Sequence, residues 1–287
     1  MSETRETRNS VFTQNPHGMP AGHAISHADK LKQDFGLEIP VELIPMPSGG
    51  RVYNQNSPLF MREAVEIKAM TTKEEDILTS RGLLKKGTVI TELIKSCLLD
   101  KTINTHDLLS GDRNALMVAI RITGYGTEYS VEIDCPSCAV KNKKSFDLSE
   151  LPLRRLEIEP VSVGVNCFEF RLPYTQKLVR FRFLTGKDEE DIMATQEKQK
   201  KFMSNESMVT TSLAYSIISI DGIEDRNKIS NFVKSMPARD SLALRSYMKD
   251  NEPGILMKGE FECESCSHES EVDIPIGVSF LWPQTRR

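Results

Sequence analysis

The most informative part of this sequence is a pair of matched segments, Glu132-Ile-Asp-Cys-Pro-Ser-Cys138 and Glu260-Phe-Glu-Cys-Glu-Ser-Cys266. In each segment polar and apolar residues alternate up to the first cysteine, which is typical of a β-strand with one buried face. A tight Cys-x-x-Cys turn follows, so each pair of cysteines is expected at the tip of a hairpin between two short strands. Two such hairpins indicate that the fold contains two copies of a unit that ends in a hairpin.

The cysteines Cys135, Cys138, Cys263 and Cys266 predict a metal site. Two thiolates in one turn can bind one ion, and two such pairs complete the tetrahedral shell of structural zinc. The separation between Cys138 and Cys263 is much longer than in an ordinary zinc ribbon, so we expect the hairpins to face each other and share one four-thiolate zinc. Two separate pairs, unmetallated or redox-active, remain the alternative, and His268 could replace one thiolate. A closed four-sulfur shell leaves no position for water, so this zinc is not expected to be catalytic.

A strand followed by a helix also occurs twice in the sequence. Val65–Leu78 resembles Val179–Met193, and each segment passes from alternating residues into a threonine followed by an acidic cluster. One added residue in the second segment aligns Glu74-Glu75-Asp76-Ile77 with Glu189-Glu190-Asp191-Ile192. A threonine before acidic residues is the signature of a capped helix start, and carboxylates there also favour the helix dipole.

Two further matches occur in the same order. The helical segment Val89–Leu93 has a counterpart in Val209–Leu213, and Asp112 matches Asp240 at the same distance before a hairpin cysteine. Asp112 is expected to cap a helix. Together these matches predict an α+β fold of two tandem pseudo-symmetric repeats of short strands and helices, each ending in a Cys-x-x-Cys zinc-knuckle hairpin.

The repeats define three regions. Residues 1–40 have few large apolar groups and several prolines and glycines, and they are interpreted as a flexible N-terminal arm. Residues 41–155 form repeat 1 with the first knuckle. Residues 156–287 form repeat 2 with the second knuckle and a C-terminal tail. The histidines of the arm are interpreted as part of a polar tail rather than as metal ligands: His17, His23 and His27.

The composition limits the class of protein. The chain has 287 residues with 37 Lys plus Arg and 41 Asp plus Glu, a formal net charge of −4. Its longest apolar run, Ala115–Ile120, is far shorter than the ~20 residues of a membrane span. Its first residues lack the apolar core of a secretory signal, so a soluble cytosolic protein is expected. The acidic balance and the scarcity of aromatic residues argue against nucleic-acid binding. A zinc-ribbon nucleic-acid-binding regulator nevertheless remains the alternative function, and an oxidoreductase using the cysteine pairs is a third hypothesis.

No catalytic motif is present in the sequence. It has no Gly-x-Ser-x-Gly, no His-Glu-x-x-His and no dinucleotide-binding glycine pattern. Cys97 and Cys167 lie among apolar residues and are expected to be buried. We therefore expect neither enzymatic activity nor a small-molecule substrate.

Several stretches resemble the baseplate hub proteins of T-even-type contractile-tailed phages. They are the helix Gly111–Ile122 with Gly124-Tyr-Gly126, the Cys135/Cys138 knuckle, the turn Pro47–Tyr53 and the helix Thr71–Leu78. The resemblance covers about residues 41–160 well and the second half more loosely, through Pro237–Asp240, the second knuckle and the Phe280/Trp282/Pro283 ending.

The resemblance implies a virion or tail-assembly protein without catalytic activity that works by contact with other baseplate and tail proteins. It would be located in the tail baseplate, and in the host cytoplasm during assembly; a permanent part and an assembly helper both remain open. Docking is expected through the arm, through Arg51 and Tyr53 of the turn, through Arg113 and through Trp282. The Trp282 side chain either packs on its own core or anchors in a neighbouring subunit.

Overall fold

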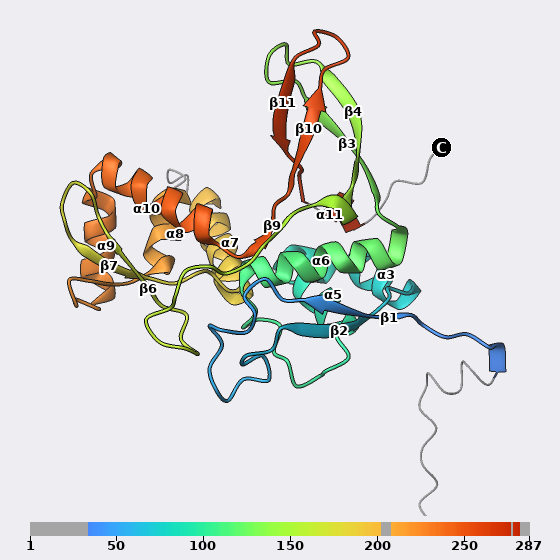
Figure 1. Cartoon of the computed structure of the whole chain (residues 1–287), viewed down its shortest axis with the longest axis horizontal. Helices are drawn as coiled ribbons and strands as arrows, with labels where there is room; N and C mark the ends of the chain where they lie inside the picture. The colour runs from blue at the N-terminus through green and yellow to red at the C-terminus, as the bar shows by residue number, and fades with distance from the viewer. Residues whose placement is uncertain (1–33, 202–207, 277, 282–287) are drawn as a thin grey trace, which may run out of the picture. The chain divides into compact units, whose positions relative to one another are not determined.

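The computed structural model describes residues 34–201, 208–276 and 278–281 (Figure 1). The chain forms two compact units, residues 1–39 and 40–287. The unit 40–287 holds the elements discussed below. Most of the predicted N-terminal arm, with its three histidines, lies outside the described residues, as does Trp282.

The first half of unit 40–287 starts with a two-stranded antiparallel sheet. Strand β1 (Val41–Pro45) pairs with β2 (Ala64–Lys68), so that Val41 is opposite Lys68. Four helices follow: α3 (Thr72–Thr79), α4 (Arg81–Lys86), α5 (Val89–Cys97) and α6 (Ser110–Tyr125). The hairpin of β3 (Glu128–Asp134) and β4 (Lys141–Asp147) comes next, and then the 3-10 turn η2 (Leu148–Glu150) and β5 (Leu153–Arg154). The predicted strands and helices of this half are all present, with small shifts at their ends.

The second half contains an antiparallel sheet in the order β6-β7-β8. Its strands are β6 (Phe168–Arg171), β7 (Leu178–Phe181) and β8 (Ile217–Ile220). The helices are α7 (Gly186–Lys201), α8 (Met208–Ser216), α9 (Arg226–Ser235) and α10 (Ala238–Asn251). The chain continues through β9 (Gly254–Ile255), which pairs with β5, the hairpin of β10 (Lys258–Glu262) and β11 (Glu269–Asp273), and α11 (Val278–Leu281). The fold therefore mixes helices with small antiparallel sheets.

Helix α6 lies at the centre of this unit (Figure 1). Eleven of its residues are buried, from Ser110 through Arg121, because apolar side chains occur all around its axis. Gly111 lets the helix approach β9 closely: a Cβ at this position would lie 1.6 Å from the backbone oxygen of Pro253. None of the described helices is long and apolar enough to cross a membrane.

The start of α3 is fixed by a buried acidic side chain. Glu74 accepts hydrogen bonds from the backbone N–H of Thr71 at 3.0 Å and from its hydroxyl at 2.6 Å. It also pairs with Lys68 at 2.6 Å and accepts from Ser96 at 2.6 Å. Burial disfavours the Glu74 carboxylate, but these hydrogen bonds outweigh burial and lower the pKa of Glu74 to about 2. The predicted capping box is confirmed.

The start of α7 repeats the contacts of Glu74 with a threonine and a basic residue. Asp188 accepts from the N–H and hydroxyl of Thr185 and forms two hydrogen bonds at 2.7 Å with Arg182. The contacts therefore match Glu74 with Asp188, not with Glu189 as the sequence alignment predicted. In both segments the acidic residue that caps the helix is the third helical residue. The two segments therefore align without the added residue that the sequence alignment used.

Candidate metal centre

The two cysteine pairs lie in the turns of two antiparallel hairpins. Cys135 and Cys138 lie between β3 and β4, and Cys263 and Cys266 lie between β10 and β11. Figure 1 shows the hairpins extending from the region of α6 with their turns at the same end. Because each cysteine pair lies in the turn of its hairpin, all four cysteines lie at this common tip.

The two turns have the same backbone geometry. The N–H of Ala139 donates to the backbone carbonyl of Cys135 at 2.9 Å, and the N–H of Ser267 donates to the backbone carbonyl of Cys263 at 2.9 Å. Ala139 has φ 57° and Ser267 has φ 51°, the left-handed conformation that tightens a turn directly after the second cysteine. This conformation, which is uncommon outside glycine, brings both sulfurs of a pair to one side of the hairpin.

The four sulfurs form a compact cluster. All four Sγ atoms lie within 4.8 Å of one another. The shortest contacts cross between the hairpins: Cys135 to Cys266 and Cys138 to Cys263 are each 3.7 Å apart. A disulfide needs about 2.05 Å, and all six cysteines of the chain are free.

This spacing fits zinc. A tetrahedron with Zn–S bonds of about 2.3 Å has sulfur–sulfur edges of about 3.8 Å, close to the two cross-hairpin distances. The first cysteine of each pair, Cys135 and Cys263, is buried, whereas Cys138 and Cys266 are exposed. Four thiolates at this spacing repel one another strongly unless a cation lies between them.

Burial and hydrogen bonds shift the pKa values of two of these thiols in opposite directions. Burial raises the pKa of the Cys263 thiol, but the N–H groups of Cys266 and Ser265 outweigh burial and lower the pKa to about 6. The N–H of Val140 lowers the pKa of Cys138, yet desolvation and the neighbouring thiols raise the pKa to about 12. The pKa of Cys263 therefore lies below that of Cys138.

Asn142 joins the two hairpins beside the sulfurs, a role that sequence analysis missed. It is 3% exposed, and its side-chain amide donates to Val140 at 2.8 Å and contacts the Cys263 sulfur at 3.5 Å. Its side-chain oxygen accepts from the N–H of Glu264 at 2.9 Å. The available signal was the alternation of β4, which places this polar residue on the inward face opposite Ile133.

Comparison with known proteins identifies the family. A family model described as T4 bacteriophage base plate protein matches residues 42–282, most of the chain. The chain belongs to this family of T4-type phage baseplate proteins. No curated protein and no solved structure matches it significantly. Membership places the protein in the virion tail, among other tail proteins.

In this baseplate protein, the predicted docking residue Tyr53 is buried. It is 6% exposed, and its hydroxyl donates to Asp112 at 2.5 Å and accepts from the N–H of Leu109 at 2.9 Å. Asp112 also accepts from the N–H and hydroxyl of Ser48 at 2.9 and 2.6 Å. Burial raises the pKa of Asp112 although these hydrogen bonds lower it.

The prediction that Asp112 caps α6 is wrong. The N-cap is Leu109, and Asp112 is the third helical residue, where its carboxylate holds the turn 47–53 instead. Asp240 has the same position in α10, with Pro237 as N-cap. It accepts from the N–H groups of Tyr174 and Thr175 at 2.7 and 3.0 Å. Each carboxylate thus binds a tight turn that is distant in sequence.

Arg51 and Arg113 also bind within the chain. Arg51 pairs with Glu159 and donates to the Leu156 carbonyl at 3.2 Å, with its side chain 28% exposed. Arg113 is 5% exposed and donates to Thr91 at 2.9 Å. These contacts give both arginines an internal role, and little of the Arg113 side chain is accessible to a partner.

Proposed function

We propose that this chain is a non-enzymatic structural or assembly protein of the baseplate hub of a contractile phage tail, whose two halves are joined by one structural zinc ion. The observation that carries the proposal is the sulfur cluster: ligands from two hairpins far apart in sequence lie at the spacing of a zinc tetrahedron. Cys135, Cys138, Cys263 and Cys266 would hold the ion.

Matched contacts support two tandem repeats. Asp112 binds Ser48 and Asp240 binds Thr175, each across nearly the same number of residues. The capping pairs at the starts of α3 and α7 correspond in the same way. A repeat boundary near 155/156 accords with the pairing of β5 with β9, through which the end of repeat 1 meets the second half.

Zinc would supply stability that the hairpin tips lack. Among the described residues, the buried cluster between the tips comprises Cys135, Phe261 and Cys263, with Ile133 and Val272 packed against it. So small a core contributes few kcal/mol, whereas a structural zinc contributes about 10–16 kcal/mol of apparent binding energy. A closed four-sulfur shell gives the ion no water to activate, which favours a structural role.

The nucleic-acid alternative finds little support in the charges of the first hairpin. In the β3–β4 register, Lys143 is opposite Glu132 and Lys141 is opposite Asp134. Lys144 lies 3.6 Å from Glu264 of the other hairpin. These lysines are therefore offset by acidic neighbours and form no basic surface of the kind that binds phosphates.

Metal analysis of the full chain tests the zinc proposal. We expect one zinc per chain after purification without added metal, and its loss only with unfolding. Two ions or none per folded chain would contradict the shared site.

The hub role is tested separately by cryo-electron microscopy of tails and tail intermediates. We expect density for this chain at the baseplate centre in at least one of them, and its absence from all would reject the role.

A further inference from the structure

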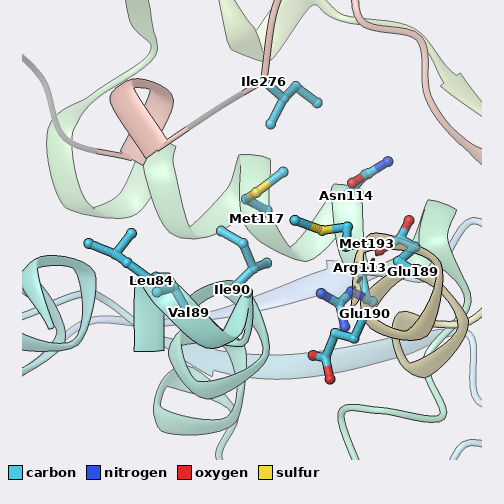
Figure 2. Close-up of a pocket in the computed structure, with 11 residues that line it drawn as sticks. Leu84, Val89, Ile90, Arg113, Asn114, Met117, Glu189, Glu190, Met193 and Ile276 are labelled. Atoms are coloured by element: carbon cyan, nitrogen blue, oxygen red, sulfur yellow. Dashed lines mark ion pairs between the residues drawn. The ribbon is translucent and has the colours of Figure 1, made fainter. Parts of the chain in front are cut away.

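A cavity of about 280 Å³ lies among α4, α5, α6 and α7, and its charged groups are paired within the chain (Figure 2). The Arg113 guanidinium lies 3.6 Å from Glu189. Glu190 accepts a hydrogen bond from Thr91 and lies 3.3 Å from Nδ1 of His106. Each charged side chain that lines this cavity therefore has a partner among the described residues. The polar side chains beside the cysteine cluster are matched less evenly.

Asn142 and Ser270 occupy equivalent positions in the two hairpins. Each is the fourth residue after the second cysteine of its pair. Asn142 is opposite Ile133 in the β3–β4 register, and Ser270 is opposite Phe261 in the β10–β11 register. The Asn142 side chain bonds to the other hairpin, whereas the Ser270 hydroxyl oxygen is buried and has no hydrogen-bond partner among the described residues. The two hairpins thus have similar backbones but different side-chain contacts at this position.

The hydrogen bonds of Asn142 fix the orientation of its amide. The Val140 carbonyl can only accept and the Glu264 N–H can only donate, so Nδ2 faces Val140 at 2.8 Å and Oδ1 faces Glu264 at 2.9 Å. In this orientation Nδ2 also lies 3.5 Å from the Cys263 sulfur, to which it donates. One amide therefore contacts both the backbone and a metal-binding sulfur of the other hairpin.

This contact makes the surroundings of the first cysteine of each pair unequal. The Cys135 sulfur accepts from the N–H of Ser137 at 3.4 Å, and the Cys263 sulfur accepts from the N–H of Ser265 at 3.4 Å. The Asn142 amide is an additional donor to Cys263. Hydrogen bonds to a thiolate favour the charged form that binds metal, and they orient the sulfur.

We propose that Asn142 is a positioning residue of the metal centre, which holds the Cys263 sulfur and the Glu264 backbone against the first hairpin so that both cysteine pairs face one ion. Lys144 of the same strand lies 3.6 Å from the Glu264 carboxylate, so β4 contacts this residue twice. The inference rests on the proposed zinc site and adds to it. The two hairpins supply equal numbers of ligands, but the first hairpin also supplies the side chain that orients a ligand of the second.

The zinc affinity of the full-length chain, measured by competition with a chromophoric chelator, tests this role. Asn142→Ala should bind zinc about 10–100-fold more weakly, as is usual when a partner of a metal ligand is removed. Ser270→Ala is the matched control: it changes the equivalent position and removes a hydroxyl without a partner among the described residues, so it should leave the affinity unchanged. Asn142→Leu retains the size of the side chain without its hydrogen bonds and should weaken binding as Asn142→Ala does. If Asn142→Leu instead restores the affinity, the effect belongs to packing and the proposal is overturned.

Cobalt in place of zinc gives a second readout, which a general loss of stability would not move. A hydrogen bond stabilises the lone pairs of a thiolate, so its removal lowers the energy of the sulfur-to-metal charge-transfer absorption. With saturating Co²⁺, this absorption should lie at longer wavelength in Asn142→Ala and Asn142→Leu than in the unmodified protein and Ser270→Ala. The same wavelength in all four proteins would overturn the proposal. An unmodified chain that binds neither zinc nor cobalt would instead reject the proposed zinc site, so the two failures are distinguishable.

Discussion

Cys135→Ser and Cys263→Ser should be equally damaging and strongly non-additive, because each opens the same four-sulfur shell. The two cysteines lie on different hairpins, and each has its nearest sulfur contact, at 3.7 Å, with a cysteine of the other hairpin. A mutation that removes a structural metal typically lowers the free energy of unfolding by about 4 kcal/mol or more. We expect each single variant to lose this amount of unfolding free energy, and the double variant to lose little more than either, about half of the sum.

Urea unfolding in a zinc-buffered solution, followed by circular dichroism, measures these energies. Cys167→Ser is the matched control, since Cys167 is an 8% exposed cysteine outside the cluster. Combined with Cys135→Ser, it should add its own cost, because distant sites are additive within about 0.5 kcal/mol. A strong chelator should lower the unmodified protein to the stability of the single variants. Simple additivity of Cys135→Ser and Cys263→Ser would show that the two knuckles act separately and would refute the shared site.

Three further predictions concern the helical body. The pKa of Glu74 is about 2 in the folded protein and 4.5 ordinarily. The ionised Glu74 side chain therefore stabilises the fold above about pH 5, and this stabilisation is lost as the pH falls toward 2. Glu74→Gln should cost about 2–3 kcal/mol of unfolding free energy at pH 7, measured by urea unfolding, and should flatten this part of the dependence of stability on pH. Gly186→Ala should lower the thermal midpoint, at a cost of about 1–3 kcal/mol, because a Cβ there would lie 1.8 Å from Nη1 of Arg113. Tyr53→Phe should cost about 1–3 kcal/mol in urea unfolding, because it leaves the Asp112 carboxylate with one hydrogen bond fewer in a buried site.

Each of these variants has a control at an exposed position. Asp76→Asn changes an exposed side chain of the same helix as Glu74 and should cost little stability at pH 7. Gly82→Ala has no atom closer than 4.0 Å and should be neutral or slightly stabilising. Tyr174→Phe affects a 66% exposed ring and should have little effect. If a control variant loses as much stability as its test variant, the contacts assigned to the test residue are contradicted.

Local patterns were sufficient for much of the secondary structure. The start of α3 followed from a threonine and an acid at capping distance. Such features depend on neighbours in sequence, so periodicity and capping chemistry specify them. The cysteine spacing likewise predicted two hairpin turns, because a Cys-x-x-Cys turn is a local structure.

The roles of Asp112, Tyr53 and Arg113 could not be predicted in the same way. A sequence places Asp112 near a helix start, but only the folded chain brings Ser48 and Tyr53 to it and turns an expected cap into a buried hydrogen-bond acceptor. Arg113 was expected at a surface and instead lies against Gly186 of another helix. Contacts between distant segments decide these roles.

The sequence by itself determined many of the elements, a capped helix start at Thr71 or Thr72, and the four thiols that can bind a metal, because spacing along the chain controls them. The tertiary structure decided which sulfurs meet, which carboxylates are buried and where Asn142 joins the hairpins. The physical reason is that burial and long-range hydrogen bonds depend on how hairpins and helices pack, and side chains distant in sequence become neighbours only when that packing forms.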